Sequence, residues 1–153
     1  MKKLGFVAIL LLGGCQFWLA GHTADYGLVL HGEGTADPMA GTTRYTFIIE
    51  GTGIKCTGSS VKKPGTQNRS LNTITCDDGR TAKGESWLIS MDTGAGAGTD
   101  SCGNKVLTAF SANKSYVDDK LAEFRAKVKA SPNAGNDKCT SSMGIPPHND
   151  PLI

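Results

Sequence analysis

Outside its first three residues, the sequence has no excess of either charge, which argues against nucleic acid as a partner. The 153-residue chain has 16 basic and 14 acidic side chains, and Lys2 and Lys3 belong to an N-terminal leader. Electrostatic binding of nucleic acid needs basic residues clustered on one face. The strongest local run after the leader is only the pair Lys62 and Lys63. We therefore expect no nucleic-acid partner.

Aromatic residues and long apolar runs are also scarce. Phe, Trp and Tyr make up 7% of the chain, which contains 20 glycines. This composition favours short strands and many turns over a helical bundle. The apolar run at residues 4–12 is too short to cross a bilayer as a helix. A chain of this length is expected to form one domain.

The N-terminal segment has the parts of an export signal. A positive start at Lys2 and Lys3 is followed by the apolar run and then by Leu12-Gly13-Gly14-Cys15. These four residues resemble the lipobox of bacterial lipoproteins, in which the cysteine is lipidated and becomes the first residue of the mature chain. The resemblance implies a signal peptide over residues 1–14, lipidation with palmitate-type chains at Cys15, and a tether over residues 15–24.

The same resemblance implies a location. Several acyl chains together anchor a protein stably, and Gln16 after the cysteine is typical of lipoproteins held at the outer membrane, facing the periplasm. The apolar stretch at residues 17–20 leaves an alternative open. Ordinary cleavage near Gly21 or Ala24 would yield a secreted or soluble periplasmic protein.

The cysteine count agrees with lipidation. Of five cysteines, assigning Cys15 to lipid leaves an even number in an exported chain, as expected for a disulfide framework. Four cysteines allow three pairings, and we favour Cys56–Cys76 with Cys102–Cys139 because each pair joins neighbours along the chain. Zinc is the alternative use of these residues, but no CxxC pair or closely spaced histidine pair is present.

Alternating apolar and polar residues predict strands. The clearest pattern runs over residues 43–50, where Tyr45, Phe47 and Ile49 share one face. An Asp-Asp-Gly turn at residues 77–79 predicts a hairpin. Its second strand is expected to point Trp87, Ile89 and Met91 inward. The expected strands lie at residues 25–30, 43–50, 54–58, 71–76, 85–91 and 106–110, with loops at 59–70 and through the Gly-rich residues 92–100.

One helix is expected over residues 115–130. Ser115 with Asp118 three residues later resembles a capping box, and Ser131-Pro132 ends the segment. Apolar residues of this segment form one stripe at helical spacing: Val117, Leu121, Phe124 and Val128. The chain is thus predicted to form a mainly β domain over residues 25–139, a small antiparallel barrel or sandwich of about six strands with a C-terminal helix, followed by a flexible tail over 140–153.

The segment Asp92-Thr93-Gly94-Ala95 resembles the Asp-Thr-Gly-Ala signature of aspartic proteases. That family uses two aspartates that share a proton, so a single copy needs a dimer. The same Gly-rich stretch ends at Asp100, and Asp92 with Asp100 is a weak calcium-binding candidate. Gly94, Gly96 and Gly98 lack the βαβ context of a dinucleotide site. We therefore expect no cofactor and no resident metal.

Two further groups of residues are candidate sites. His31, Glu33 and Asp37 lie close in sequence, but a solvated strand end is the simpler interpretation. Binding residues concentrate on loops held by a rigid scaffold, which predicts a partner surface on two loops. Its residues are Lys62, Lys63, Gln67, Asn68, Gly94, Gly96, Gly98 and Thr99.

Taken together, these patterns predict a non-catalytic lipoprotein that binds envelope proteins or serves as a structural component of the bacterial cell envelope. A small periplasmic inhibitor or immunity protein that blocks an incoming enzyme is the first alternative. An enzyme similar to aspartic proteases is the second. The polar residues that could take part in catalysis, such as His31 and His148, are scattered singly along the sequence. This favours the non-catalytic functions.

Lipidation at Cys15 is tested with labelled palmitate in cells that produce the full chain. The wild-type protein is expected to incorporate the label, whereas Cys15→Ser is expected to incorporate none, because the lipobox resemblance assigns the acyl-bearing residue to that position. Equal labelling of the two proteins would contradict the assignment.

Overall fold

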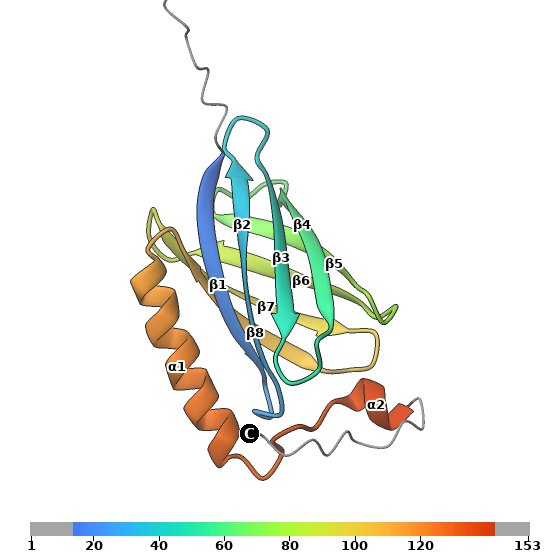
Figure 1. Cartoon of the computed structure of the whole chain (residues 1–153). Helices are drawn as coiled ribbons and strands as arrows, with labels where there is room; N and C mark the ends of the chain where they lie inside the picture. Colours follow the sequence, from blue (N-terminus) through green and yellow to red (C-terminus); the bar gives the residue numbers. More distant parts are fainter. Residues whose placement is uncertain (1–13, 143–153) are drawn as a thin grey trace, which may run out of the picture.

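Eight antiparallel strands close into a barrel in the computed structural model, which describes residues 14–142 (Figure 1). Each strand pairs with the next along the chain, and the last pairs with the first. The prediction of a mainly β domain is confirmed; of the two expected forms, barrel or sandwich, the chain forms the barrel, with eight strands in place of about six. The elements are β1 (Cys15–Thr23), β2 (Val29–Asp37), β3 (Thr42–Ile49), β4 (Lys55–Lys62), β5 (Arg69–Cys76), β6 (Thr81–Leu88), β7 (Thr93–Asp100), β8 (Lys105–Ser111), α1 (Lys114–Ala130) and α2 (Lys138–Ser142).

Strand β1 occupies the segment that was expected to be a tether. Leu19 lies opposite Gly32 of β2 and opposite Phe110 of β8, so this strand joins the two edges of the sheet. Both of its faces are covered: Leu19 packs inside the barrel, while Ala20 packs beneath α1. A strand covered on both faces lacks the alternation of a half-exposed strand. The tether over residues 15–24, which the lipobox resemblance implied, is therefore corrected to a strand over Cys15–Thr23.

Strand β7 corrects the expectation of a Gly-rich loop. Residues 93–100 pair with β6 on one side and with β8 on the other, so they are a full member of the sheet. The loop expected at residues 59–70 is also shorter, because β4 continues to Lys62 and β5 begins at Arg69. At the end of β6, Ile89 and Met91 are exposed and do not point inward.

The alternation predicted in β3 is confirmed. Phe47 and Ile49 belong to the buried interior, and Tyr45 packs against it. Ile48, between Phe47 and Ile49, is exposed on the outer face. Inward residues of the neighbouring strands complete this core: Leu19, Leu28, Leu30, Cys56 and Cys76.

Helix α1 confirms the predicted helix and its apolar stripe. Val117, Leu121 and Phe124 are buried against the outer face of the barrel, beside Ala20 and Val29. The helix begins one residue earlier than expected, because Asn113 is the N-cap: its side chain accepts hydrogen bonds from the backbone N–H groups of residues 115 and 116. Among residues 14–142, no helix is long and apolar enough to cross a membrane.

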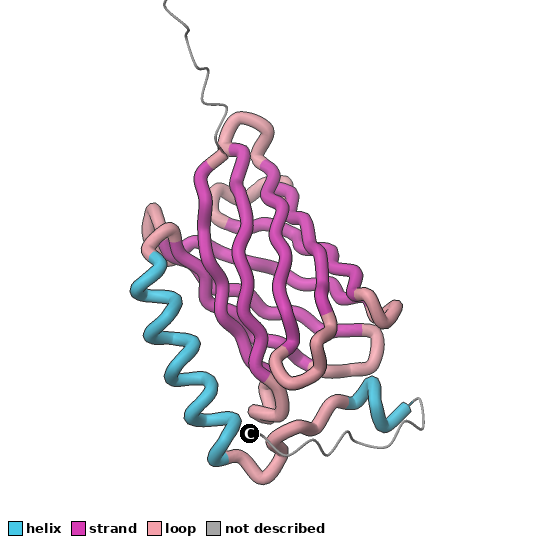
Figure 2. The backbone as a smooth tube through the Cα atoms, viewed as in Figure 1, coloured by secondary structure: helices cyan, strands magenta, loops and turns pink. Residues whose placement is uncertain are grey.

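The two ends of the barrel differ, as the distribution of turns in Figure 2 shows. We call one end the mouth; it contains Cys15 and the turns at residues 38–41, 63–68 and 89–92. We call the other end the base; it contains the turns at residues 24–28, 50–54, 77–80 and 101–104. The segment from the end of α1 through α2 lies at the base (Figure 1).

Both predicted disulfides are present. Cys56 and Cys76 face each other across β4 and β5, and Cys102 is joined to Cys139 of α2. Cys15 is a free, exposed cysteine. The second disulfide therefore ties the C-terminal segment to the base. Of the tail predicted over residues 140–153, the first three belong to α2, and residues 143–153 lie outside the described part of the chain.

Docking of α1 is tested by Phe124→Ala. Phe124 is buried and packs against the His22 ring, so the substitution is expected to lower the free energy of unfolding by about 3–5 kcal/mol. Lys129→Ala, at an exposed position of the same helix, serves as the control and is expected to change it by less than about 0.5 kcal/mol. Chemical denaturation measures both. Equal stability of the two variants would show that the helix contributes little to the fold.

Candidate ligand-binding cavity

A cavity of about 540 Å³ occupies the interior of the barrel. Small-molecule sites typically measure about 300–1,000 Å³, so the space suits one small molecule. The lining extends to Cys15, Pro38, Gln67 and Met91 at the mouth. The cavity therefore opens at the mouth.

Small residues on the inner face create this space. Gly94, Gly96 and Gly98 form the inner face of β7, and Gly32 and Gly34 lie on the inner face of β2. A Cβ at Gly32 or Gly34 would overlap backbone and aromatic atoms of β1 and β3. These glycines therefore let large rings on neighbouring strands lie flat against the wall. The rings that pack over inward glycines are those of Phe17, Tyr45 and Phe110.

The part of the cavity nearer the base is apolar. Leu30, Phe47, Ile74 and the Cys56–Cys76 disulfide pack together there. Burial of apolar surface contributes roughly 25 cal/mol per Å². An apolar group of a ligand would therefore be stabilised against this wall.

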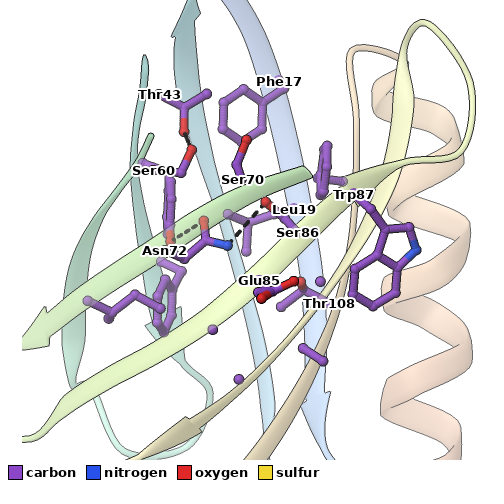
Figure 3. A pocket seen from close by; sticks show the side chains of 18 of the residues that line it. Phe17, Leu19, Thr43, Ser60, Ser70, Asn72, Glu85, Ser86, Trp87 and Thr108 are labelled. Carbon is purple, nitrogen blue, oxygen red and sulfur yellow. Dashed lines mark hydrogen bonds between the residues drawn. The ribbon is translucent and has the colours of Figure 1, made fainter. Parts of the chain in front are cut away.

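A row of hydrogen-bonding side chains crosses the cavity wall (Figure 3). The Tyr45 hydroxyl donates to Asn72 Oδ1 at 3.2 Å, and Asn72 Nδ2 donates to Ser86 Oγ at 3.1 Å. Burial raises the pKa of Tyr45 to about 12, so this hydroxyl stays neutral at physiological pH. The row adds neutral donors and acceptors to a mainly apolar lining. Ser60, Ser70 and Thr108 add further hydroxyls.

A charged cluster closes the base. The Arg80 guanidinium donates to both carboxylate oxygens of Asp137, at 2.7 and 3.3 Å, and to Asp78 at 2.8 Å. Asn104 donates to Asp100 and to Asp137. Burial raises the pKa of Asp78, but the hydrogen bonds and charge of Arg80 outweigh it, so the pKa is lowered. All of these groups except Asp78 are buried, and the cluster seals the end opposite the mouth.

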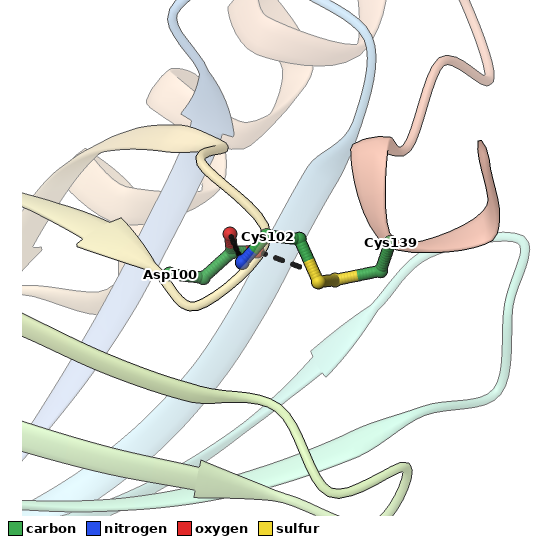
Figure 4. A group of neighbouring side chains, drawn as sticks. All are labelled: Asp100, Cys102 and Cys139. Carbon is green, nitrogen blue, oxygen red and sulfur yellow. Dashed lines mark hydrogen bonds between the residues drawn. A yellow bond between two sulfur atoms is a disulfide. The ribbon is translucent and has the colours of Figure 1, made fainter. Parts of the chain in front are cut away.

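Asp100, Cys102 and Cys139 lie close together, as Figure 4 shows. The two sulfurs are bonded to each other, so they are not available as thiolate ligands. Asp100 Oδ1 accepts from the backbone N–H groups of Cys102 and Asn104, at 2.9 and 2.8 Å. This carboxylate organises the turn between β7 and β8, and its oxygens are already engaged.

The structure separates the two aspartates of the calcium candidate. Asp92 lies at the mouth and Asp100 at the base, so eight residues of extended chain, about 26 Å, lie between them. The two carboxylates therefore do not form one site. Asp92 is exposed and accepts hydrogen bonds from Ser90 and Thr93, which lower its pKa.

The predicted partner surface is divided by the fold. Lys62, Lys63, Gln67 and Asn68 lie around one turn at the mouth. Three of the other members, the alternate glycines of β7, face the barrel interior, while Thr99 is exposed. The eight residues do not form a single loop surface. Lys63 itself is paired with Glu85 at 2.5 Å.

His31 does not join Glu33 and Asp37 in a cluster. Its Nδ1 lies 2.8 Å from Glu50 Oε1, and Arg125 of α1 binds the same carboxylate. Asp37 instead accepts hydrogen bonds from the backbone of the β2–β3 turn. Glu33 and Asp37 are exposed, so the interpretation of these residues as a solvated strand end fits this arrangement.

The cavity residues had a weak signal in the sequence. The glycines at positions 94, 96 and 98 recur with period two, which is the strand period, and the same spacing occurs at Gly32 and Gly34. Asn72 and Ser86 gave no comparable signal, because a polar residue at an inward position looks like an exposed one. Arg80, Asn104 and Asp137 come together only through the tertiary fold.

Comparison with known proteins finds likeness at the level of the fold. Neither a protein-family model nor a curated protein sequence matches the chain. The redesigned β-barrel mFAP1 bound to DFHBI has a TM-score of 0.53 and 20% identity, covering 66% of this chain and 94% of that chain. EF1p2_mFAP2b bound to DFHBI has a TM-score of 0.54 and 16% identity, covering 66% and 93%. A de novo designed fluorescence-activating β-barrel has a TM-score of 0.52 and 17% identity, covering 64% and 91%.

The neutrality of Tyr45 is tested by alkaline titration. In the unfolded chain its hydroxyl ionises near pH 10, and in the folded protein near pH 12. Its contribution to stability is therefore complete below pH 10 and is lost as the pH rises to about 12. The absorbance difference between wild type and Tyr45→Phe isolates this residue and is expected to show a midpoint near 12. A midpoint near 10 would show that water reaches the hydroxyl freely.

Proposed function

We propose that this protein is a non-catalytic binding protein whose barrel holds a small, mainly apolar molecule with one hydrogen-bonding group. The observation that carries the proposal is the cavity of about 540 Å³, open at the mouth and closed at the base. Its apolar part would hold the body of the ligand, and the Tyr45–Asn72–Ser86 row would hold the polar group.

The solved structures of similar fold support the idea that such a barrel binds a small molecule. mFAP1 and EF1p2_mFAP2b both hold DFHBI. A barrel of this fold therefore accommodates a small molecule, although the identity of the ligand does not transfer at 16–20% identity.

The export signal in the sequence indicates where in the cell this binding protein is located. We propose that the chain is anchored through lipid on Cys15 at the outer membrane and faces the periplasm. Two disulfides suit an oxidising compartment outside the cytoplasm.

Binding of envelope protein is a second proposed activity, and one surface favours it. Val61 and Leu71 are neighbours across β4 and β5 and are both exposed on the outer wall. A partner that covers this apolar pair would gain roughly 25 cal/mol for each Å² of apolar surface removed from water. Val61→Ser with Leu71→Ser is expected to reduce capture of such a partner without changing binding in the cavity.

Ligand binding is tested with the neutral apolar fluorophore N-phenyl-1-naphthylamine. A soluble form is used, in which a cleavable signal peptide replaces residues 1–14 and Ser replaces Cys15. The probe is expected to brighten on entering the cavity. Ser86→Leu fills part of that space and is expected to weaken binding by about tenfold or more, which corresponds to about 1.4 kcal/mol.

Ser59→Leu is the matched control, because Ser59 is exposed and does not line the cavity. It makes the same change of residue on the same barrel and is expected to leave the dissociation constant unchanged. The proposal is wrong if the two variants bind the probe equally, or if the wild-type protein does not bind it.

A further inference from the structure

Three large apolar side chains project from the mouth. Met39, in the β2–β3 turn, is 98% exposed; Met91 and Ile89, in the β6–β7 turn, are 100% and 66% exposed. These two turns lie on opposite sides of the opening, because four strands separate them around the barrel. Within residues 14–142, no large apolar side chain of comparable exposure lies in the turns of the base.

We call Met39, Ile89 and Met91 the rim of the mouth. The position of Cys15, where a lipid would be attached, indicates what covers this rim. Strand β1 begins at Cys15, and Cys15 itself lines the opening of the cavity. The apolar residues 4–12 precede it in the sequence. Acyl groups on Cys15, or the apolar segment itself, would therefore join the barrel at the mouth. Because no spacer separates Cys15 from the sheet, such an attachment holds the mouth next to the lipid.

The charged residues at the mouth are consistent with a lipid contact made by apolar side chains. Lys63 and Arg69 both pair with Glu85, and Lys114 pairs with Asp118. Lys62 adds one positive charge, and Asp37 and Asp92 add two negative ones, so these residues balance at four of each sign. Balanced charges leave little net field to attract anionic lipid. Contact through methionine and isoleucine side chains is instead expected to depend on buried apolar area.

We infer that the mouth docks on a phospholipid surface through Met39, Ile89 and Met91, so that the cavity opens directly onto the bilayer. The lipid-facing orientation rests on the rim and on the position of Cys15. Passage of an amphiphile between bilayer and cavity rests in addition on the proposed ligand-binding function. The ligand class that fits is an amphiphile that resides in the membrane.

Depth-dependent fluorescence quenching tests the docking. The protein is isolated from the producing cells with whatever N-terminus it has there and is combined with phosphatidylcholine vesicles that contain brominated acyl chains. Met39→Trp and Met91→Trp each place an indole on the rim, and Asp77→Trp places one in an exposed turn at the base. Each variant is compared with wild type, so that the native tryptophans cancel.

The two rim indoles are expected to be quenched, and the base indole is expected to stay unquenched. The quenching is expected to be the same at low and high salt, because the contact is apolar. Equal quenching at rim and base, or no quenching at the rim, would overturn the inference. Quenching that needs anionic lipid and disappears in salt would replace it with an electrostatic contact.

Transfer of N-phenyl-1-naphthylamine from the same vesicles, made without bromine, separates docking from ligand binding. Met39→Ser with Ile89→Ser, at two exposed residues that do not line the cavity, is expected to slow entry of the probe into the cavity by about tenfold, as removal of apolar contact weakens docking. The dissociation constant of the probe in solution should not change. Failure of wild type to bind the probe would refute the proposed function, whereas the quenching result would still decide the docking.

Discussion

Pairing between the first and last strands is the constraint on which the rest of this structure depends. Six register pairs join β1 to β8, and they turn a meander of hairpins into a closed barrel. Closure removes the unpaired edges that an open sheet would expose. It also encloses the cavity and brings β1 and β8 together beneath α1, which packs across both. Without this pairing there would be no interior to bind a ligand.

The size of the interior depends on an uneven distribution of side chains between strands. Glycines on the inner faces of β2 and β7 leave space inside the barrel, and the aromatic rings of β1, β3 and β8 fill part of that space. Glycine weakens a strand because it costs backbone entropy, but here an added Cβ would collide with the neighbouring wall. The space that remains is the cavity. The same residues thus set both the curvature of the sheet and the room available inside it.

The two ends of the barrel are built from different chemistry. At the base, Arg80 and its carboxylate partners form a satisfied network, and the Cys102–Cys139 disulfide holds α2 over it. A buried charge is tolerated when its partners are in place, and breaking such a group is costly. The mouth has no comparable cover within residues 14–142, and its turns carry exposed methionines. This asymmetry gives the cavity one entrance.

Local patterns in the sequence determined the helix with its buried stripe and the alternation of β3, because each depends on residues near one another in the chain. The two disulfide pairings were favoured among three, and the fold decided between them, because the paired cysteines lie 20 and 37 residues apart. Strands β1 and β7 were missed. Residues 17–23 of β1 are buried or half-buried on both faces, and the glycines of β7 have no side chains to show an apolar face. The cavity and the Arg80–Asp137 contact arise between segments far apart in the sequence. Only the closure of the sheet decided them, because inward direction and distance across a barrel are properties of the paired strands together.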